Sequence, residues 1–154
     1  MFECSKTYKF EYAHQLFTSY TNLCHETIHG HSGKVRITFR NSAHCTVNKD
    51  NMVIDFGLIS DRIKDALMSK YDHALFIPRD FPKEYIETLK KYNKRLTITD
   101  VNPTAEQFAM DICLLVGNIL NTDKELAGFI YVSKVEFWET ESGCAVYEPK
   151  MLLL

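Results

Sequence analysis

Three histidines are the residues of this sequence best placed for metal chemistry. His29 and His31 are separated only by Gly30, and on an extended backbone two side chains at this spacing leave from the same face. His14 ends an earlier stretch, residues 9–14, that alternates with period two. If the two stretches pair as a hairpin, three imidazoles converge and leave a fourth position open, as in catalytic zinc sites. Taken alone, two such histidines can also be ordinary strand residues.

A thiol and a carboxylate precede the histidine pair. Cys24 and Glu26 stand five and three residues before His29. They can take part in chemistry at a bound metal, or they can be ordinary loop residues, and the residue types leave both interpretations open.

Composition and charge exclude several classes of protein. The chain has 154 residues, of which 45% are hydrophobic, so we expect one domain spanning residues 1–154 and exclude a disordered chain. The net charge of −2 offers no basic excess for a broad nucleic-acid surface. No apolar run reaches the roughly 20 residues of a membrane helix, and the first residues lack the apolar stretch of a signal peptide. We therefore expect a cytoplasmic protein without nucleic-acid or membrane partners.

The five cysteines are expected to be free thiols. Their odd number prevents complete pairing within one chain, and no Cys-x-x-Cys motif occurs. A reducing compartment keeps such thiols unpaired, so we interpret all but Cys24 as small apolar residues.

Hydrophobic periodicity predicts an α+β domain. The expected order is two strands (residues 9–14 and 34–40, with a possible extension at 52–54), a helix (58–71), a charged surface insertion with a short amphipathic helix (79–95), a second long helix from residue 104, and two strands (131–139 and 145–147). The simplest arrangement is a four-stranded antiparallel sheet with both long helices on one face. The exposed edges of such a sheet favour a homo-oligomer.

The helix starts carry capping signals. Asp55 is expected to cap the first long helix. At the second, Thr104 with Gln107 fits a capping box, and Asn102 with Pro103 at the first helical position fits equally well. The stripe expected to face the sheet from this helix comprises Phe108, Ile112, Leu115 and Ile119.

Six short motifs occur in order along almost the whole chain, from residue 10 to about residue 147. They are Phe10-x-x-Ala13-His14, Cys24 before His29-Gly30-His31, Val53-Ile54-Asp55-Phe56, Asp72-His73, Asn102-Pro103-Thr104-Ala105-Glu106, and Glu139-Thr140. In this order they resemble the 6-pyruvoyl-tetrahydropterin synthase / 6-carboxy-tetrahydropterin synthase family. The bacterial 6-carboxy branch, which serves queuosine synthesis, is the most similar.

The resemblance implies a fold and an activity. Members adopt the T-fold, a β-β-α-α-β-β unit whose subunits join their sheets into a barrel, commonly as homohexamers with active sites between subunits. The implied activity is that of a zinc-dependent lyase, which converts 7,8-dihydroneopterin triphosphate to 6-carboxy-5,6,7,8-tetrahydropterin.

The resemblance also implies the catalytic residues. Cys24 matches the general base, and Asp72-His73 matches a carboxylate and imidazole that relay a proton; the alternative for this dipeptide is a turn at a helix end. The implied ligands of Zn2+ are His14, His29 and His31.

Three further residues match the pterin pocket. Glu139 would accept the paired N–H groups of the pterin edge, although it can also be an exposed strand carboxylate. Thr104 and Glu106 would line the same pocket, and capping and first-turn charge explain them as well. Both explanations can hold together.

Two features depart from the 6-carboxy branch. The spacing from Cys24 to His29 is one residue longer than usual, and Glu26 falls inside it. This string is similar to a subgroup in which the glutamate is linked to side-chain cleavage, giving 6-hydroxymethyl-dihydropterin for folate synthesis. A 6-pyruvoyl-tetrahydropterin synthase and a zinc-containing pterin-binding protein without turnover stay open as alternatives. The insertion at 79–95 is also longer than expected.

Overall fold

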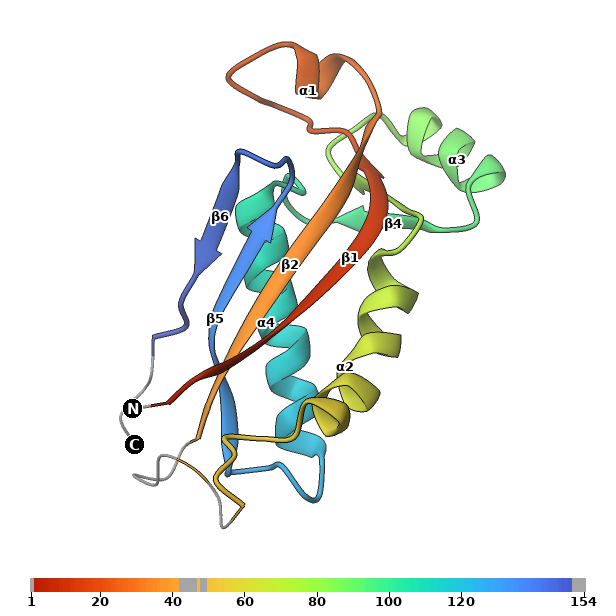
Figure 1. Cartoon of the computed structure of the whole chain (residues 1–154). Coiled ribbons are helices and arrows are strands. Elements are labelled where there is room, and N and C mark those ends of the chain that lie inside the picture. Colours follow the sequence, from red (N-terminus) through yellow and green to blue (C-terminus); the bar gives the residue numbers. More distant parts are fainter. Residues whose placement is uncertain (1, 42–46, 48–49, 151–154) are drawn as a thin grey trace.

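A six-stranded mixed sheet organises the chain in the computed structural model, which describes residues 2–41, 47 and 50–150 (Figure 1). Cys45 lies outside the described residues. The strands, in the spatial order β4-β3-β1-β2-β5-β6, are β1 (Cys4–His14), β2 (His29–Asn41), β3 (Ala74–Pro78), β4 (Leu96–Thr99), β5 (Ile130–Trp138) and β6 (Cys144–Tyr147). The helices are α1 (Leu23–Glu26), α2 (Phe56–Tyr71), α3 (Lys83–Tyr92) and α4 (Ala105–Thr122).

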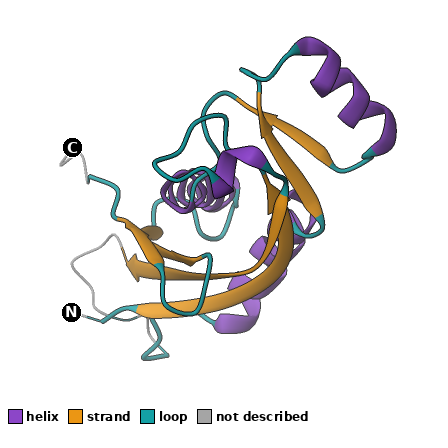
Figure 2. Ribbon diagram, turned by 90° about the horizontal axis from the view of Figure 1, so that it is seen from above, coloured by secondary structure: helices purple, strands orange, loops and turns teal. Residues whose placement is uncertain are grey.

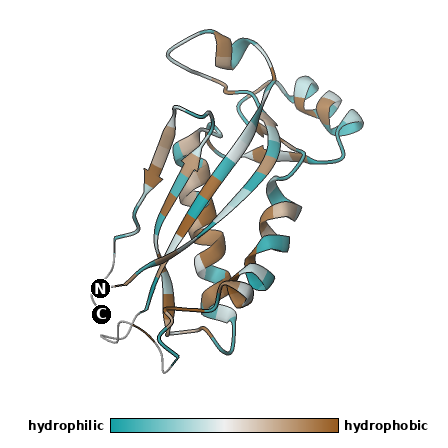
Figure 3. Ribbon diagram, viewed as in Figure 1, coloured by the Kyte–Doolittle hydropathy of each residue, from teal (hydrophilic) through white to brown (hydrophobic). Residues whose placement is uncertain are grey.

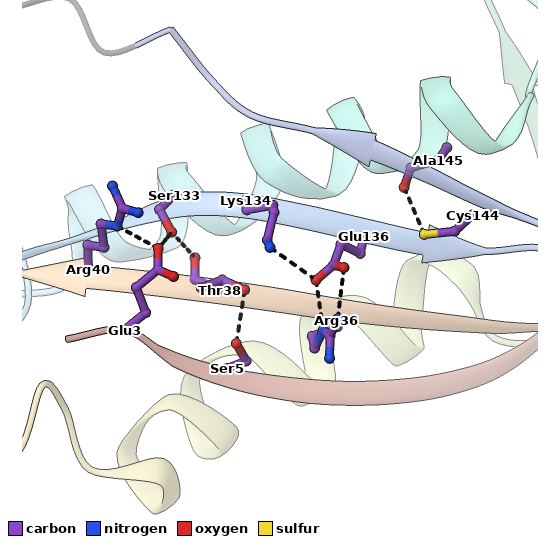
Figure 4. Close-up of polar contacts among 10 residues, drawn as sticks. All are labelled: Glu3, Ser5, Arg36, Thr38, Arg40, Ser133, Lys134, Glu136, Cys144 and Ala145. Atoms are coloured by element: carbon purple, nitrogen blue, oxygen red, sulfur yellow. Dashed lines mark hydrogen bonds and ion pairs between the residues drawn. The ribbon is translucent and has the colours of Figure 1, made fainter. Parts of the chain in front are cut away.

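Four of the strands form the predicted antiparallel sheet. β1 pairs with β2, β2 with β5 and β5 with β6, each antiparallel. Val35, Ile37 and Phe39 of β2 are completely buried on one face, and the bands of alternating hydropathy along β2 and β5 are visible in Figure 3. The opposite face is polar: the Arg36 guanidinium donates to both carboxylate oxygens of Glu136, at 2.7 and 2.8 Å (Figure 4).

Both long helices cover the apolar face of this sheet, as predicted. The sheet curves around α4 when seen from above (Figure 2). Tyr71 of α2 stacks on Phe10 of β1 at 5.3 Å between ring centroids, and Phe108 of α4 lies 5.3 Å from Phe137 of β5. Asp55 caps α2 as expected, with its carboxylate accepting from two backbone N–H groups.

The sheet has six strands where the sequence predicted four. β3 lies parallel to β1, and β4 lies parallel to β3, so the insertion forms a β3-α3-β4 crossover beside the antiparallel strands. The five residues of β3 are all buried and do not alternate, and β4 is only four residues long. Such short runs carry no usable periodicity. The short helix predicted in this insertion is confirmed by α3.

Two smaller expectations were wrong. Residues 52–54 extend no strand, because the chain turns there into the Asp55 cap, while Ile54 packs into the core. On α4 the buried face includes Val116 and Leu120 in place of Leu115 and Ile119, which are only partly buried. This helix is apolar around much of its circumference, so its sequence fits more than one orientation.

Two expectations from composition agree with the structure. Of the described cysteines, Cys4, Cys24, Cys113 and Cys144 are free thiols. No helix in the described ranges has both the length and the apolar composition needed to cross a membrane.

Replacing Phe108 with alanine should destabilise the protein by about 3–5 kcal/mol, because the ring is buried between α4 and the sheet and its loss leaves a cavity. Urea unfolding of Phe108→Ala measures the change. Leu114→Ala is the matched control on the same helix, since Leu114 is 55% exposed. Equal losses for the two variants would contradict the assigned core.

Candidate metal centre

The pairing of β1 with β2 brings the three histidines together, as predicted. His14 stands directly opposite His29, and His31 stands two residues further along β2. The ring nitrogens that face one another lie within 4.8 Å, and the Nε2 atoms of His14 and His29 are 3.0 Å apart. The three imidazoles therefore converge on one position at the end of the hairpin.

Backbone carbonyls fix the tautomers of two of these rings. A carbonyl oxygen can only accept, so the Nδ1–H of His14 donates to the oxygen of Pro103 at 2.7 Å. In the same way the Nδ1–H of His29 donates to the oxygen of Thr27 at 3.2 Å. In both neutral rings the lone pair is then on Nε2, and carbonyls in this role are common behind metal-bound histidines.

These residues fit a divalent cation. With both tautomers fixed, the two Nε2 atoms at 3.0 Å present lone pairs to each other and have no proton to share. The buried Nε2 of His31 has no hydrogen-bond partner. His14, His29 and His31 would hold the cation through Nε2, and a set of three imidazoles with one further position suits zinc.

Burial keeps the histidines ready to bind a metal. It lowers the pKa of His14 and of His31 below the ordinary value of 6.5, and the nearby carboxylate of Glu139 opposes this shift without reversing it. Desolvation thus favours the neutral imidazole at pH 7, which is the form that donates a lone pair.

Glu139, the expected pterin anchor, lies beside the three rings. Its Oε1 is 3.4 Å from Nε2 of His14 and 3.7 Å from Nε2 of His31. The buried hydroxyl of Tyr12 donates to the same oxygen at 2.9 Å. Burial and the adjacent Glu139 both raise the pKa of Tyr12, so this donor keeps its proton. The carboxylate is therefore held in place and faces both the histidines and any ligand that reaches them.

A glycine makes room for Tyr12. A Cβ at Gly33 would lie 2.9 Å from Cε1 of the Tyr12 ring, closer than real side chains approach. Tyr12 was not among the predicted site residues. The sequence feature that could have identified it is its position two residues before His14, on the same face of β1.

Cys24 and Glu26 lie in the loop between β1 and β2, on α1. The backbone N–H of Leu16 donates to the carbonyl of Cys24 at 2.9 Å, which ties α1 to the end of the strand that carries His14. The Cys24 side chain is half-buried and Glu26 is exposed. Across the described residues, neither side chain is bonded to an imidazole of the site.

The Asp72-His73 pair forms, and across the described residues neither side chain is bonded to the three imidazoles. Oδ2 of Asp72 lies 3.1 Å from Nδ1 of His73, and Oδ1 accepts the backbone N–H of Glu11 at 3.0 Å, which lowers the pKa of Asp72. His73 has a positive φ of 57° and an exposed side chain. It lines a hollow of about 560 Å³ together with Glu11, Ser32 and the metal-ligand candidate His31.

Thr104 and Glu106 start α4. Thr104 is its N-cap and accepts the N–H of Gln107 at 3.4 Å, so Asn102 is not the cap. The return half of the capping box does not form, because the Gln107 amide donates to Asp111 at 2.8 Å. Asn102 instead holds the loop: its side chain accepts from the N–H of Phe17 at 2.7 Å. Thr104 and Glu106 also line a hollow of about 580 Å³ whose other wall includes residues 16 and 18–20.

Comparison with known proteins gives the class of this protein. Residues 3–150 match the family model described as 6-pyruvoyl tetrahydropterin synthase. A 6-carboxy-5,6,7,8-tetrahydropterin synthase of Haemophilus influenzae is 28% identical over 150 residues, covering 96% of this chain and 99% of its own. One from Rickettsia conorii is 31% identical over 110 residues, covering 71% and 75%.

Solved structures share the fold. An uncharacterized protein, WS1659 from Wolinella succinogenes, superposes with a TM-score of 0.75 at 20% identity, covering 97% of this chain and 98% of its own. The 6-pyruvoyl tetrahydropterin synthase of Caenorhabditis elegans superposes with a TM-score of 0.64 at 18% identity, covering 96% and 95%. The chain thus belongs to the 6-pyruvoyl tetrahydropterin synthase family and has its T-fold. It is an enzyme of the lyase type.

The purified protein should bind about one zinc ion per chain, and His31→Ala should lose most of it, because two imidazoles hold a cation far more weakly than three. Elemental analysis after dialysis measures the content. His25→Ala is the control, since His25 lies on α1, outside the cluster. Full zinc retention by His31→Ala would rule out this centre.

The metal-free protein should lose stability as the pH falls from about 7.5 towards 5.5. The unfolded chain takes up protons at its histidines near pH 6.5, whereas burial holds the folded-state pKa values of His14 and His31 lower. Stability is therefore present above pH 6.5 and declines as the pH falls towards those lower values. Urea midpoints across this range test it, with His31→Ala expected to flatten the dependence. A midpoint independent of pH would refute the assignment.

Proposed function

We propose that the protein is a zinc-dependent lyase that converts 7,8-dihydroneopterin triphosphate to 6-carboxy-5,6,7,8-tetrahydropterin, releasing triphosphate and a two-carbon fragment. The observation that carries the proposal is the convergence of three imidazoles beside the Glu139 carboxylate. The product follows the names of the Haemophilus and Rickettsia relatives. We place the reaction in the queuosine pathway and in the cytoplasm.

The residues present divide the chemistry among them. A bound zinc ion would act as a Lewis acid that acidifies a hydroxyl or its neighbouring C–H on the substrate side chain. Glu139, fixed by Tyr12, accepts the N–H pair of the pterin and sets its orientation. Cys24 removes a proton as the thiolate, which a nearby cation favours. Thr104 and Glu106 border the hollow at the start of α4.

We also propose that the active site is completed between subunits of a homohexamer. Across the described residues, neither Asp72 nor His73 is bonded to Glu139 or to the three imidazoles, so we infer that the pair serves a substrate held by another chain. β4 and β6 are the two edges of the sheet, where a neighbouring chain can pair. A barrel closed in this way would bring Asp72-His73 of one subunit to the metal centre of another.

Glu26 supports a second outcome for the same substrate. A Plasmodium vivax 6-pyruvoyltetrahydropterin synthase with a TM-score of 0.60 and 16% identity was solved with a catalytic glutamate replaced by alanine. Glu26 stands in the loop beside Cys24, exposed and therefore accessible to a substrate. With Glu26 as base, side-chain cleavage would give 6-hydroxymethyl-dihydropterin, a folate precursor. A pterin-binding protein without turnover is the non-enzyme alternative.

Incubation of the zinc-loaded protein with 7,8-dihydroneopterin triphosphate, followed by mass analysis of the pterin, should yield 6-carboxy-tetrahydropterin. Cys24→Ala should lower the rate by about 10²–10⁴-fold while zinc and fold are retained, because a general base contributes that much. Cys144→Ala, which removes an exposed thiol elsewhere in the chain, is the matched control.

The product separates the alternatives. If the wild-type protein forms only 6-hydroxymethyl-dihydropterin, and if Glu26→Gln abolishes this product while Cys24→Ala still forms it, the protein is assigned to folate synthesis. Absence of any turnover by the wild-type protein, together with tight pterin binding, would leave only the non-enzyme alternative.

A further inference from the structure

The β3-α3-β4 unit, residues 74–99, contacts the loop that carries Cys24 and Glu26. β3 pairs in parallel with the last three residues of β1, so that Phe76 stands beside His14. α3 and the turn before it contact Gln15 and Phe17, which follow β1, and Figure 1 shows α1 and α3 at the same end of the molecule. The proposed reaction gives this unit no role.

Gln15 joins the two segments through both ends of its amide. Its Nε2–H donates to the carbonyl of His25 in α1 at 2.7 Å, and its Oε1 accepts the hydroxyl of Tyr85 in α3 at 2.6 Å. A carbonyl cannot donate, so the nitrogen must face His25 and the oxygen must face Tyr85. Gln15 is only 6% exposed, which makes loss of either partner costly.

An aromatic contact also joins the loop to the β3-α3-β4 unit, beside the hydrogen bonds of Gln15. Phe17 of the loop meets Phe81, just before α3, edge to face at 5.2 Å between centroids, and Phe81 in turn contacts Tyr85 at 5.2 Å. The loop therefore contacts the unit through the Gln15–Tyr85 hydrogen bond, this aromatic pair and the backbone hydrogen bond from Gln15 to Phe76.

The loop that contains α1 has few stabilising interactions of its own. α1 has four residues, no side-chain cap and no buried residue. A single turn of helix is not stable by its own hydrogen bonds, so contacts from outside must hold it.

We propose that Gln15 and Tyr85 are positioning residues, through which the β3-α3-β4 unit fixes α1, and with it Cys24 and Glu26, relative to the metal ligands. This inference rests on the proposed function for its catalytic consequence, but the mechanical link is independent of it. Gln15 follows His14 directly, so the bridge relates the thiol and carboxylate of α1 to the strand end that carries a ligand.

Tyr85→Phe tests the link, because it removes one hydroxyl and keeps the ring that contacts Phe81. Amide hydrogen exchange of residues 23–28 and alkylation of Cys24, resolved from other thiols by peptide mass mapping, should both accelerate by about three- to tenfold, as expected for one lost hydrogen bond. Tyr92→Phe is the matched control on the same helix, since Tyr92 is 71% exposed, and it should match the wild type.

Gln15→Glu separates the two halves of the bridge. The carboxylate still accepts from Tyr85 but presents an oxygen to the carbonyl of His25, so exchange in α1 should rise while exchange in α3 stays unchanged. In the enzyme, kcat should fall by about three- to tenfold in both variants while KM changes by less than about twofold, because Glu139 and Thr104 are untouched.

Exchange and alkylation rates equal to those of the wild type in Tyr85→Phe would overturn the inference, whatever the activity. Faster exchange with unchanged kcat would also overturn it, because the link would then be structural only. If the wild-type protein has no turnover, the proposed function fails, and the exchange and alkylation data still decide whether the unit holds the loop.

Discussion

The pairing register of β1 with β2 is the constraint on which the site depends. It runs without a shift from Cys4 opposite Phe39 to His14 opposite His29. Because side chains alternate between faces, a slip by one residue would move His14 to the polar face and expose the apolar residues of the strand. Burial of apolar residues such as Phe10 and Val35 therefore fixes the positions of the imidazoles. The hydrophobic core thus sets the geometry of the candidate metal site.

The site combines desolvated imidazoles with a carboxylate that stays partly open to solvent. Burial lowers the pKa of His14 and of His31, which favours the form that binds a cation, while the Glu139 side chain keeps 30% of its exposure. The Tyr12 hydroxyl donates to this carboxylate and fixes its position. Tyr12, which lies on the same strand as His14, thus links the candidate metal ligands to Glu139, the expected pterin anchor.

Much of this arrangement was predictable from the sequence, and the misses have physical causes. Period-two alternation revealed β1 and β2 and allowed the three histidines to be grouped, and the Asp55 cap was found from its residue type. β3 was missed because a strand buried on both faces does not alternate. The face of α4 was misplaced because apolar residues surround much of the helix, and packing against β5 and β6 selected the orientation.

The sequence by itself determined the candidate ligand types, the spacing of His29 and His31, the two long helices with the four antiparallel strands, and the family. Only the tertiary structure decided that β3 and β4 extend the sheet, that Tyr12 holds Glu139, and that Gln15 joins α1 to α3. The reason is that periodicity and capping act over a few neighbouring residues and leave a pattern in the chain. Contacts between residues 70 or 127 positions apart leave none, since any of many polar residues could have made them.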